Sequence, residues 1–71
     1  MIDHPISLSV VRKRHRYSQK QFAAMMGVHI QTLSKWETGK QDQPWSASLL
    51  AYLIDKHPAI RDEVEKIAGV I

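Results

Sequence analysis

The sequence contains no cysteine, and it has only three glycines, three prolines and one phenylalanine among its 71 residues. Without cysteine, neither a disulfide nor a thiolate metal site can supplement the core. It also contains no apolar run near 18 residues and no charged-then-apolar leader, so we expect a cytoplasmic chain with no membrane partner. A chain this short buries only about 60% of its unfolded surface. We therefore expect one domain over residues 1–71, stabilised by tight helix packing or by dimerisation.

Patterns that indicate catalysis are also missing from the sequence. There is no glycine-rich phosphate loop, no nucleophile elbow and no pair of carboxylates at a catalytic spacing. The four histidines show no i, i+4 pairing and have no cysteine partners. We therefore expect no catalytic residue, no metal site and no cofactor, which excludes an enzyme.

Charge is distributed unevenly along the chain, whose net charge is +3. Residues 1–40 carry seven lysines and arginines against two acidic residues, and residues 41–71 carry three against five. A basic half joined to a mildly acidic half is typical of a surface that faces a polyanion, with a separate surface for packing or for a partner. Chance clustering on a solvated face explains the same distribution, and charge alone does not separate the two.

Apolar spacing and helix-terminating residues predict an all-α fold, a compact bundle of about five short helices. Ser18 and Gln21 have the spacing of a capping box, and Gly27 supplies the positive φ that ends a helix. Ser46 is predicted to cap the fourth helix. Four predicted helices cover residues 5–14, 19–26, 30–37 and 58–68, and the fourth in chain order follows Ser46, with Leu49, Leu50, Leu53 and Ile54 at helical spacing.

The second and third predicted helices are separated by only three residues, which is the spacing of a helix-turn-helix unit. So short a turn makes the helices cross steeply, and the small side chain of Ala23 suits that crossing. Val28, Leu33 and Trp36 are then predicted to point inward. The outward side of the third helix carries a single charge and consists of Ile30, Gln31, Ser34 and Lys35.

Three segments, residues 18–23, 27–28 and 33–40, resemble the Cro/CI-type, lambda-repressor-like helix-turn-helix family of repressors. The resemblance covers about residues 5–57, and residues 49–58 resemble the DNA-binding part of antitoxins that repress their own toxin operons. It implies a lambda-repressor-like domain with its helix-turn-helix at residues 18–38, which binds double-stranded DNA and regulates transcription. The chain departs from the family at Arg16, where members often have glycine, and at the fourth-helix start, where Trp45 lies in the usual proline-rich segment.

The resemblance also implies which residues contact bases, because residues 30–37 match the recognition helix that enters the major groove. Glutamine can pair with adenine, lysine can donate to guanine, and isoleucine can pack on a thymine methyl group. An ordinary solvated helix face is the alternative, and the first of these residues could simply cap the helix. The predicted base contacts are His29, Ile30, Gln31 and Lys35.

Phosphate contacts are implied in the same way, with Gln19 matching the phosphate-binding glutamine at the start of the family's second helix. Helix capping is the alternative for Ser18, and loop solvation for Lys40. Arg12 and Glu37 match a family ion pair that joins the first helix to the recognition helix. The predicted phosphate contacts are Ser18, Gln19, Lys20, Ser34, Thr38 and Lys40.

Three functional hypotheses follow from the sequence. The first is a homodimeric repressor of its own promoter that reads an inverted-repeat operator, with a dimer interface at Leu53, Ile60, Val64, Ile67 and Ile71. The same apolar stripe could instead cover the chain's own helices. The second hypothesis is an antitoxin-like module that binds a toxin or another protein through the last helix and Val70. The third is non-specific binding of nucleic acid by the basic half.

Overall fold

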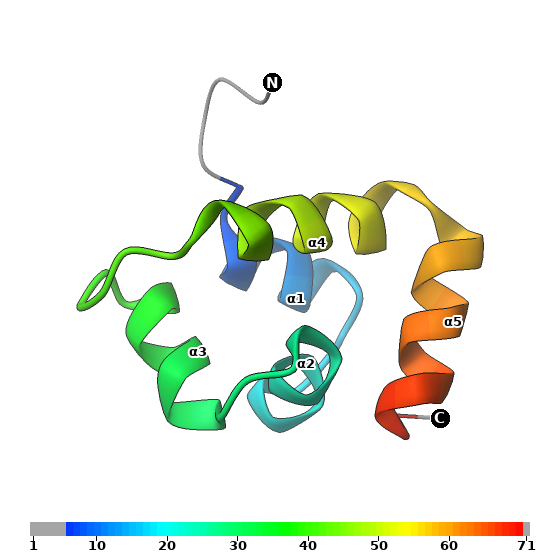
Figure 1. Cartoon of the computed structure of the whole chain (residues 1–71), viewed down its shortest axis with the longest axis horizontal. Coiled ribbons are helices and arrows are strands. Elements are labelled where there is room, and N and C mark those ends of the chain that lie inside the picture. The colour runs from blue at the N-terminus through cyan, green and yellow to red at the C-terminus, as the bar shows by residue number, and fades with distance from the viewer. Residues whose placement is uncertain (1–5, 71) are drawn as a thin grey trace.

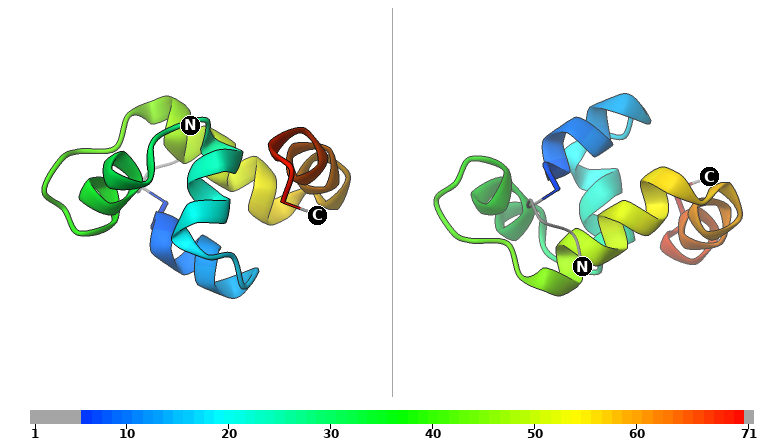
Figure 2. Two further views of the ribbon diagram at one scale, coloured as in Figure 1. Left: turned by 90° about the horizontal axis from the view of Figure 1, so that it is seen from below. Right: turned by 90° about the horizontal axis from the view of Figure 1, so that it is seen from above.

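The computed structural model describes residues 6–70, which form five α-helices and no strand (Figure 1). In chain order these are α1 (Leu8–Arg14), α2 (Gln19–Met26), α3 (Ile30–Glu37), α4 (Trp45–Lys56) and α5 (Pro58–Ala68). Helices α3 and α5 lie at opposite ends of the molecule with α2 between them, and α4 runs across α1 (Figures 1 and 2). The all-α fold predicted from the sequence is confirmed.

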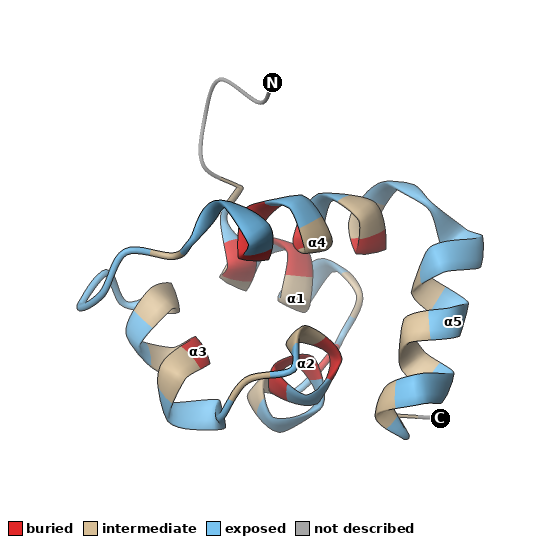
Figure 3. Ribbon diagram, viewed as in Figure 1, coloured by how far each residue is buried: buried red, intermediate tan, exposed pale blue. Residues whose placement is uncertain are grey.

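The core is built by the first four helices, each of which contributes one large, fully buried side chain. These side chains are Leu8, Phe22, Leu33 and Ile54. Helix α5 has no buried residue, and its apolar contacts with the core come from the partly buried Val64 and Ala68 (Figure 3). The helix-turn-helix unit therefore sits on a core that α1 and α4 complete, with α5 as a flank.

The starts of the first two helices are capped by serine. Ser7 Oγ accepts from the Val10 N–H at 3.3 Å, so α1 begins at Leu8, and the predicted start at Pro5 lies outside the described residues. At α2, Ser18 Oγ accepts from the Gln21 N–H at 3.0 Å, while the Gln21 side chain accepts from the Ser18 N–H at 2.9 Å. The predicted capping box is therefore confirmed, and it satisfies two N–H groups that the helix leaves unpaired.

Four turns use the left-handed backbone conformation, at Gly27, Gly39, Gly69 and Arg16, and only the last of these is not a glycine. Gly27 and Gly69 end α2 and α5 with φ of 72°, as predicted. Arg16 also has a positive φ, 60°, in the turn after α1. A side chain at this φ costs roughly 1–2 kcal/mol, because its Cβ crowds the following carbonyl oxygen. The strain expected from the absence of glycine is therefore present in this chain.

The start of α4 differs from the sequence prediction, and the structure shows which of its residues face the core. The helix begins at Trp45 with Pro44 as its N-cap and no side-chain cap, so the predicted capping role of Ser46 is wrong. Small residues dominate its inward side, while Leu49 is 42% exposed. Because small side chains let two backbones approach closely, α4 packs near α1, while Trp45, Leu49 and Tyr52 lie on its outward side. The buried residues of α4 are Ala47, Ser48, Ala51 and Ile54.

Polar contacts attach the later parts of the chain to this core. The Gln43 amide donates to Ser48 Oγ at 2.7 Å and to the Ile6 carbonyl at 2.8 Å, which fixes the α3–α4 connection. Helix α5 is held by Tyr17, whose hydroxyl donates to Glu65. Burial, together with the hydrogen bond to Glu65, raises the pKa of Tyr17 above its ordinary value of 10.0. Within residues 6–70, no helix has the length and apolarity needed to cross a membrane.

Candidate nucleic-acid interface

Helices α2 and α3 form the predicted helix-turn-helix unit. Ala23 is 3% exposed, and its carbonyl accepts from the Val28 N–H at 3.0 Å across the turn. On α3, Leu33 is fully buried, while Val28 and Trp36 are partly buried against the core. The predicted inward side of α3 is therefore confirmed, and its other side is left for solvent or a ligand.

The outward side of α3 and the loop after it enclose a shallow hollow of about 250 Å³. The loop folds back over the end of the helix, because the Gln41 N–H donates to the Lys35 carbonyl at 3.2 Å. This fold-back brings Lys40 beside the helix face. Two predicted base contacts and three predicted phosphate contacts thus share one concave surface, which is lined by Gln31, Ser34, Lys35, Thr38 and Lys40.

The remaining two predicted base contacts lie at the first turn of α3. His29 is the N-cap, and its Nδ1 accepts from the Gln31 N–H at 3.1 Å. The capping alternative considered for His29 is thus present in the structure, and it leaves the other ring nitrogen to face a ligand. Ile30 is 39% exposed, as a side chain that packs on a base would be. Base contact by either residue stays a prediction.

The three predicted phosphate contacts of α2 lie at its N-terminus, where unpaired N–H groups favour an anion. Ser18 already uses its hydroxyl as an acceptor in the capping box. Gln19 Nε2 donates to Glu37 Oε1 at 3.0 Å, which leaves its second amide hydrogen available, since a primary amide carries two. Lys20 is exposed and forms no ion pair with any described residue. The structure thus brings the three residues to one helix end.

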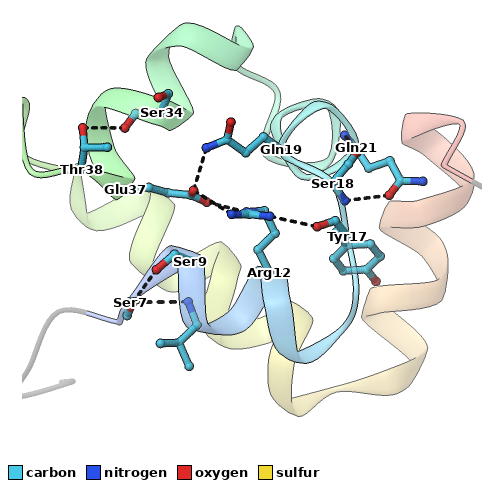
Figure 4. A network of polar contacts seen from close by, with 11 residues as sticks. Ser7, Ser9, Arg12, Tyr17, Ser18, Gln19, Gln21, Ser34, Glu37 and Thr38 are labelled. Carbon is cyan, nitrogen blue, oxygen red and sulfur yellow. Dashed lines mark hydrogen bonds and ion pairs between the residues drawn. The ribbon is translucent and has the colours of Figure 1, made fainter.

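The predicted ion pair between α1 and α3 is present and nearly buried (Figure 4). Arg12 donates to the two carboxylate oxygens of Glu37 at 2.8 and 3.2 Å, and it also donates to the Tyr17 carbonyl at 3.2 Å. The two side chains are only 14% and 5% exposed. Glu37 therefore joins α1 to α3 and, through Gln19, to the start of α2.

This network keeps Glu37 ionised. Burial raises the pKa of Glu37, but hydrogen bonds from Arg12 and Gln19 and the positive charge of Arg12 outweigh that effect. The pKa of Glu37 consequently lies below its ordinary value of 4.5. An ionised carboxylate is the stronger acceptor for the Gln19 amide, so the charge of Glu37 helps to orient a predicted phosphate contact.

Sequence reasoning missed the link between Gln19 and Glu37. It assigned Gln19 to phosphate and Glu37 to the pair with Arg12, as two separate features. The two residues lie 18 positions apart on different helices, and only the crossing of α2 and α3 brings their side chains together. No local sequence signal could have found this contact.

Of the two other predicted phosphate contacts on α3, Thr38 already engages the helix backbone through its side chain. The Thr38 hydroxyl donates to the Ser34 carbonyl at 2.9 Å at the end of the helix (Figure 4). Ser34 itself is partly buried. Thr38 therefore caps the C-terminal end of α3 in this structure. Its hydroxyl oxygen can still accept a hydrogen bond.

Two lysines at the hollow carry positive charge that no acidic residue of the described chain balances. Lys35 and Lys40 are exposed, and neither forms an ion pair with any residue from 6 to 70. Arg14, by contrast, lies 2.6 Å from Asp55, which also contacts His15 at 2.8 Å. Burial raises the pKa of Asp55, but these two contacts outweigh it and hold the pKa below 3.8. The charge of Arg14 is thus balanced within the fold.

The apolar stripe predicted as a dimer interface is divided between two environments. Val64 packs against the core, and Leu53 is partly buried. Ile60 is 37% exposed and Ile67 is 84% exposed. Ile71 lies outside the described residues. The stripe therefore covers the chain's own core along one edge and leaves its other edge in solvent.

Comparison with known proteins places this geometry in a family. The profile of a helix-turn-helix family matches residues 8–44, more than half of the chain, from the start of α1 to the residue before α4. No curated protein and no solved structure matches the chain. The matched segment contains the capped α2, the three-residue turn and the whole of α3. The chain therefore belongs to the Cro/CI-type helix-turn-helix family, whose members are DNA-binding regulators of transcription.

Proposed function

We propose that this protein is a sequence-specific repressor that binds an inverted-repeat operator as a homodimer, most simply at its own promoter. The observation that carries the proposal is the hollow on α3, which is lined by Gln31 and Lys35 of the helix and by Lys40 of the loop after it. The two lysines supply positive charge, and the glutamine supplies a paired donor and acceptor. Such a surface suits the mixed donor and acceptor edges of bases in the major groove.

In this proposal α3 enters the major groove and its exposed residues read base edges. Gln31 pairs with adenine, Lys35 donates to guanine, and Ile30 packs on a thymine methyl group. The N-terminus of α2 meets the phosphate backbone through Gln19, whose side chain Glu37 holds in place. The phosphate contacts position the domain and the base contacts select the sequence.

Two copies are needed because one short recognition helix reads too few base pairs to select a site in a genome. Equivalent faces of the major groove recur about every 10–10.5 base pairs. A dimer with twofold symmetry therefore requires an inverted repeat whose half-site centres lie about one helical turn, or a multiple of it, apart. Ile60 and Ile67 are the exposed members of the interface predicted from the sequence.

The test begins with selection of duplexes from a random pool by the full chain, followed by footprinting of the selected sequence. We expect an inverted repeat with the spacing given above, bound in the presence of excess unrelated duplex. Protection of one half-site alone would contradict the dimer. Enrichment of no sequence at all would contradict specific recognition and leave non-specific binding by the basic half.

The Lys20→Ala variant distinguishes phosphate contacts, which position the domain on DNA, from contacts that recognise bases. If Lys20 contacts phosphate, its loss weakens binding to all duplexes by a similar factor and lowers the salt dependence by about one unit of slope. Titration against the selected and an unrelated duplex at several salt concentrations measures both effects. A loss confined to the selected duplex would contradict the phosphate role.

A protein partner is the second candidate function, and the exposure of Ile67 favours it. An isoleucine that is 84% exposed, on a helix that also carries Asp62, Glu63 and Glu65, is suited to contact a toxin or another protein. Ile67→Asp tests the idea when the gene beside this one is co-expressed. Loss of co-purification with unchanged DNA affinity would support a partner surface on α5, and retention would contradict it.

A further inference from the structure

The largest group of exposed apolar side chains on neighbouring turns lies on α4. Trp45 is 52% exposed, Leu49 is 42% exposed and Tyr52 is 39% exposed. Their spacing of i, i+4 and i+7 places them on one face of the helix. We define the α4 face as these three residues together with Lys56, which follows Tyr52 at the next turn and is also exposed. Solvent is an unfavourable environment for two aromatic rings and a leucine in one stripe.

We propose that the α4 face is the surface through which two copies of this chain associate, by packing α4 against α4 in antiparallel orientation. The inference refines the proposed function, since it places the homodimer interface on α4 in place of α5. The charges on and beside the α4 face, and the symmetry of their arrangement, favour a second copy of this chain as the partner.

The absence of charge from Trp45 to Tyr52 along the α4 face disfavours a strongly basic or acidic partner and favours a second copy of this chain. No residue from Trp45 to Ile54 is charged, so an identical face can cover this stretch without burying like charges against each other. A basic or acidic partner would find no counter-charge along these three helical turns. Only the ends of the stripe carry charge, Lys56 at one end and Asp42 at the other, three residues before the helix begins.

A twofold axis brings these opposite charges together. In an antiparallel pair of identical helices, with the axis at Leu49, a residue four positions before Leu49 meets the residue four positions after it in the second copy. Trp45 then lies on Leu53 and beside Tyr52 of the second copy. Lys56, at the C-terminal end of α4, approaches the N-terminal end of the second copy's α4, where the connection that carries Asp42 joins the helix (Figure 1).

Both charges at the ends of the stripe are available for such a contact. Asp42 is exposed and forms no ion pair with another described residue. Lys56 lies 3.6 Å from Asp55, a carboxylate that already has Arg14 and His15 as closer partners. Two pairs of opposite charge would thus flank one apolar centre, which is the common arrangement of a protein interface.

The size of the α4 face predicts a weak dimer. A standard interface buries about 800 Å² on each partner, and three partly exposed side chains supply only a fraction of that area. We therefore expect association of the free chain at tens of micromolar and above, strengthened when both copies bind one operator.

Sedimentation equilibrium of the full chain without DNA tests the interface, with Leu49→Lys as the test variant and Ile67→Lys as its control. Both positions are exposed on helices, so neither change should unfold the domain. Leu49→Lys places like charges at the twofold axis and should weaken association at least about tenfold. Ile67→Lys should leave the association constant unchanged. A monomeric wild type, or dissociation by Ile67→Lys alone, would overturn the proposal.

A charge exchange tests the antiparallel register. Lys56→Asp should weaken association, because it places two acidic side chains opposite each other at each end. Adding Asp42→Lys to that variant restores opposite charges and should recover the wild-type constant. Failure of the double variant to associate better than the single one would overturn the register. Because no DNA is present, neither result depends on whether α3 reads an operator, and the selection experiment tests that claim separately.

Discussion

The outward faces of α3 and α4 differ in chemistry, although both helices pack on one core. The face of α3 is polar and carries unpaired positive charge at Lys35, with Lys40 beside it. The face of α4 has no charge over ten residues and exposes two aromatic rings. A polar, positively charged concave surface suits DNA, whereas an uncharged apolar one suits protein. The inward residues of these two helices build one shared core, while their outward residues give the domain two surfaces of different chemistry.

The largest effect should come from the inward side of α3. Trp36→Ala is expected to cost about 3 kcal/mol of unfolding free energy, at the lower end of the range for a core tryptophan. The lower end applies because Trp36 is only partly buried and its Nε1 has no hydrogen-bond partner among residues 6–70. Lys35→Ala, one position along the helix, should melt like the wild type. Thermal unfolding followed by circular dichroism measures both variants.

Equal melting temperatures for Trp36→Ala and Lys35→Ala would contradict the assignment of inward and outward sides. A domain of this size holds roughly 4–10 kcal/mol in total, so a loss of 3 kcal/mol is easily detected. The difference between the two variants is therefore the sharpest test of the orientation of α3.

The next effect concerns the Arg12–Glu37 ion pair, which orients α3. Among the described residues, the outward side of α4 has no comparable ion pair. Arg12→Ala should destabilise the domain by about 3 kcal/mol, because it leaves the nearly buried Glu37 without its cation. Arg12→Ala/Glu37→Ala should recover part of that loss, since no buried charge then remains unpaired. Chemical denaturation of the three proteins measures the coupling. A double variant less stable than Arg12→Ala would contradict this account.

Low pH should weaken the connection that the Arg12–Glu37 pair makes between α1 and α3. The pKa values of Glu37 and Asp55 in the folded chain lie below the ordinary 4.5 and 3.8. Because the folded values are depressed, the stability that these carboxylates contribute is complete above about pH 5 and is lost as the pH falls through the folded values. Glu37→Gln should therefore show a smaller loss of melting temperature than the wild type between pH 6 and about pH 3. An identical acid dependence would contradict the role of the Glu37 charge.

The sequence predicted the helix-turn-helix unit well because its signals are local. The capping box at Ser18, the positive φ of Gly27 and the inward Leu33 depend on residues within one or two turns of each other. The Arg12–Glu37 pair was predicted from the family resemblance, and the structure confirms it.

The orientation of α4 could not be predicted in the same way. Its residues 45–54 are uncharged all round the helix, so their sequence pattern does not show which side faces the core. Close packing on α1 instead selected Ala47 and Ala51 for the inside and left Leu49 outside. The contact between Gln19 and Glu37 likewise depends on the helix crossing, which sequence spacing does not give. The inward side of α4 and the contact between these two side chains are both determined by tertiary packing.

The central claim is that the outward face of α3 reads base edges. Its most direct test is the affinity of Gln31→Ala for the selected duplex and for an unrelated duplex, at one salt concentration. The account predicts a loss of about 1–3 kcal/mol on the selected duplex, little change on the unrelated one, and relaxed discrimination at one position in each half-site. An equal loss on both duplexes, with the melting temperature unchanged, would contradict the claim.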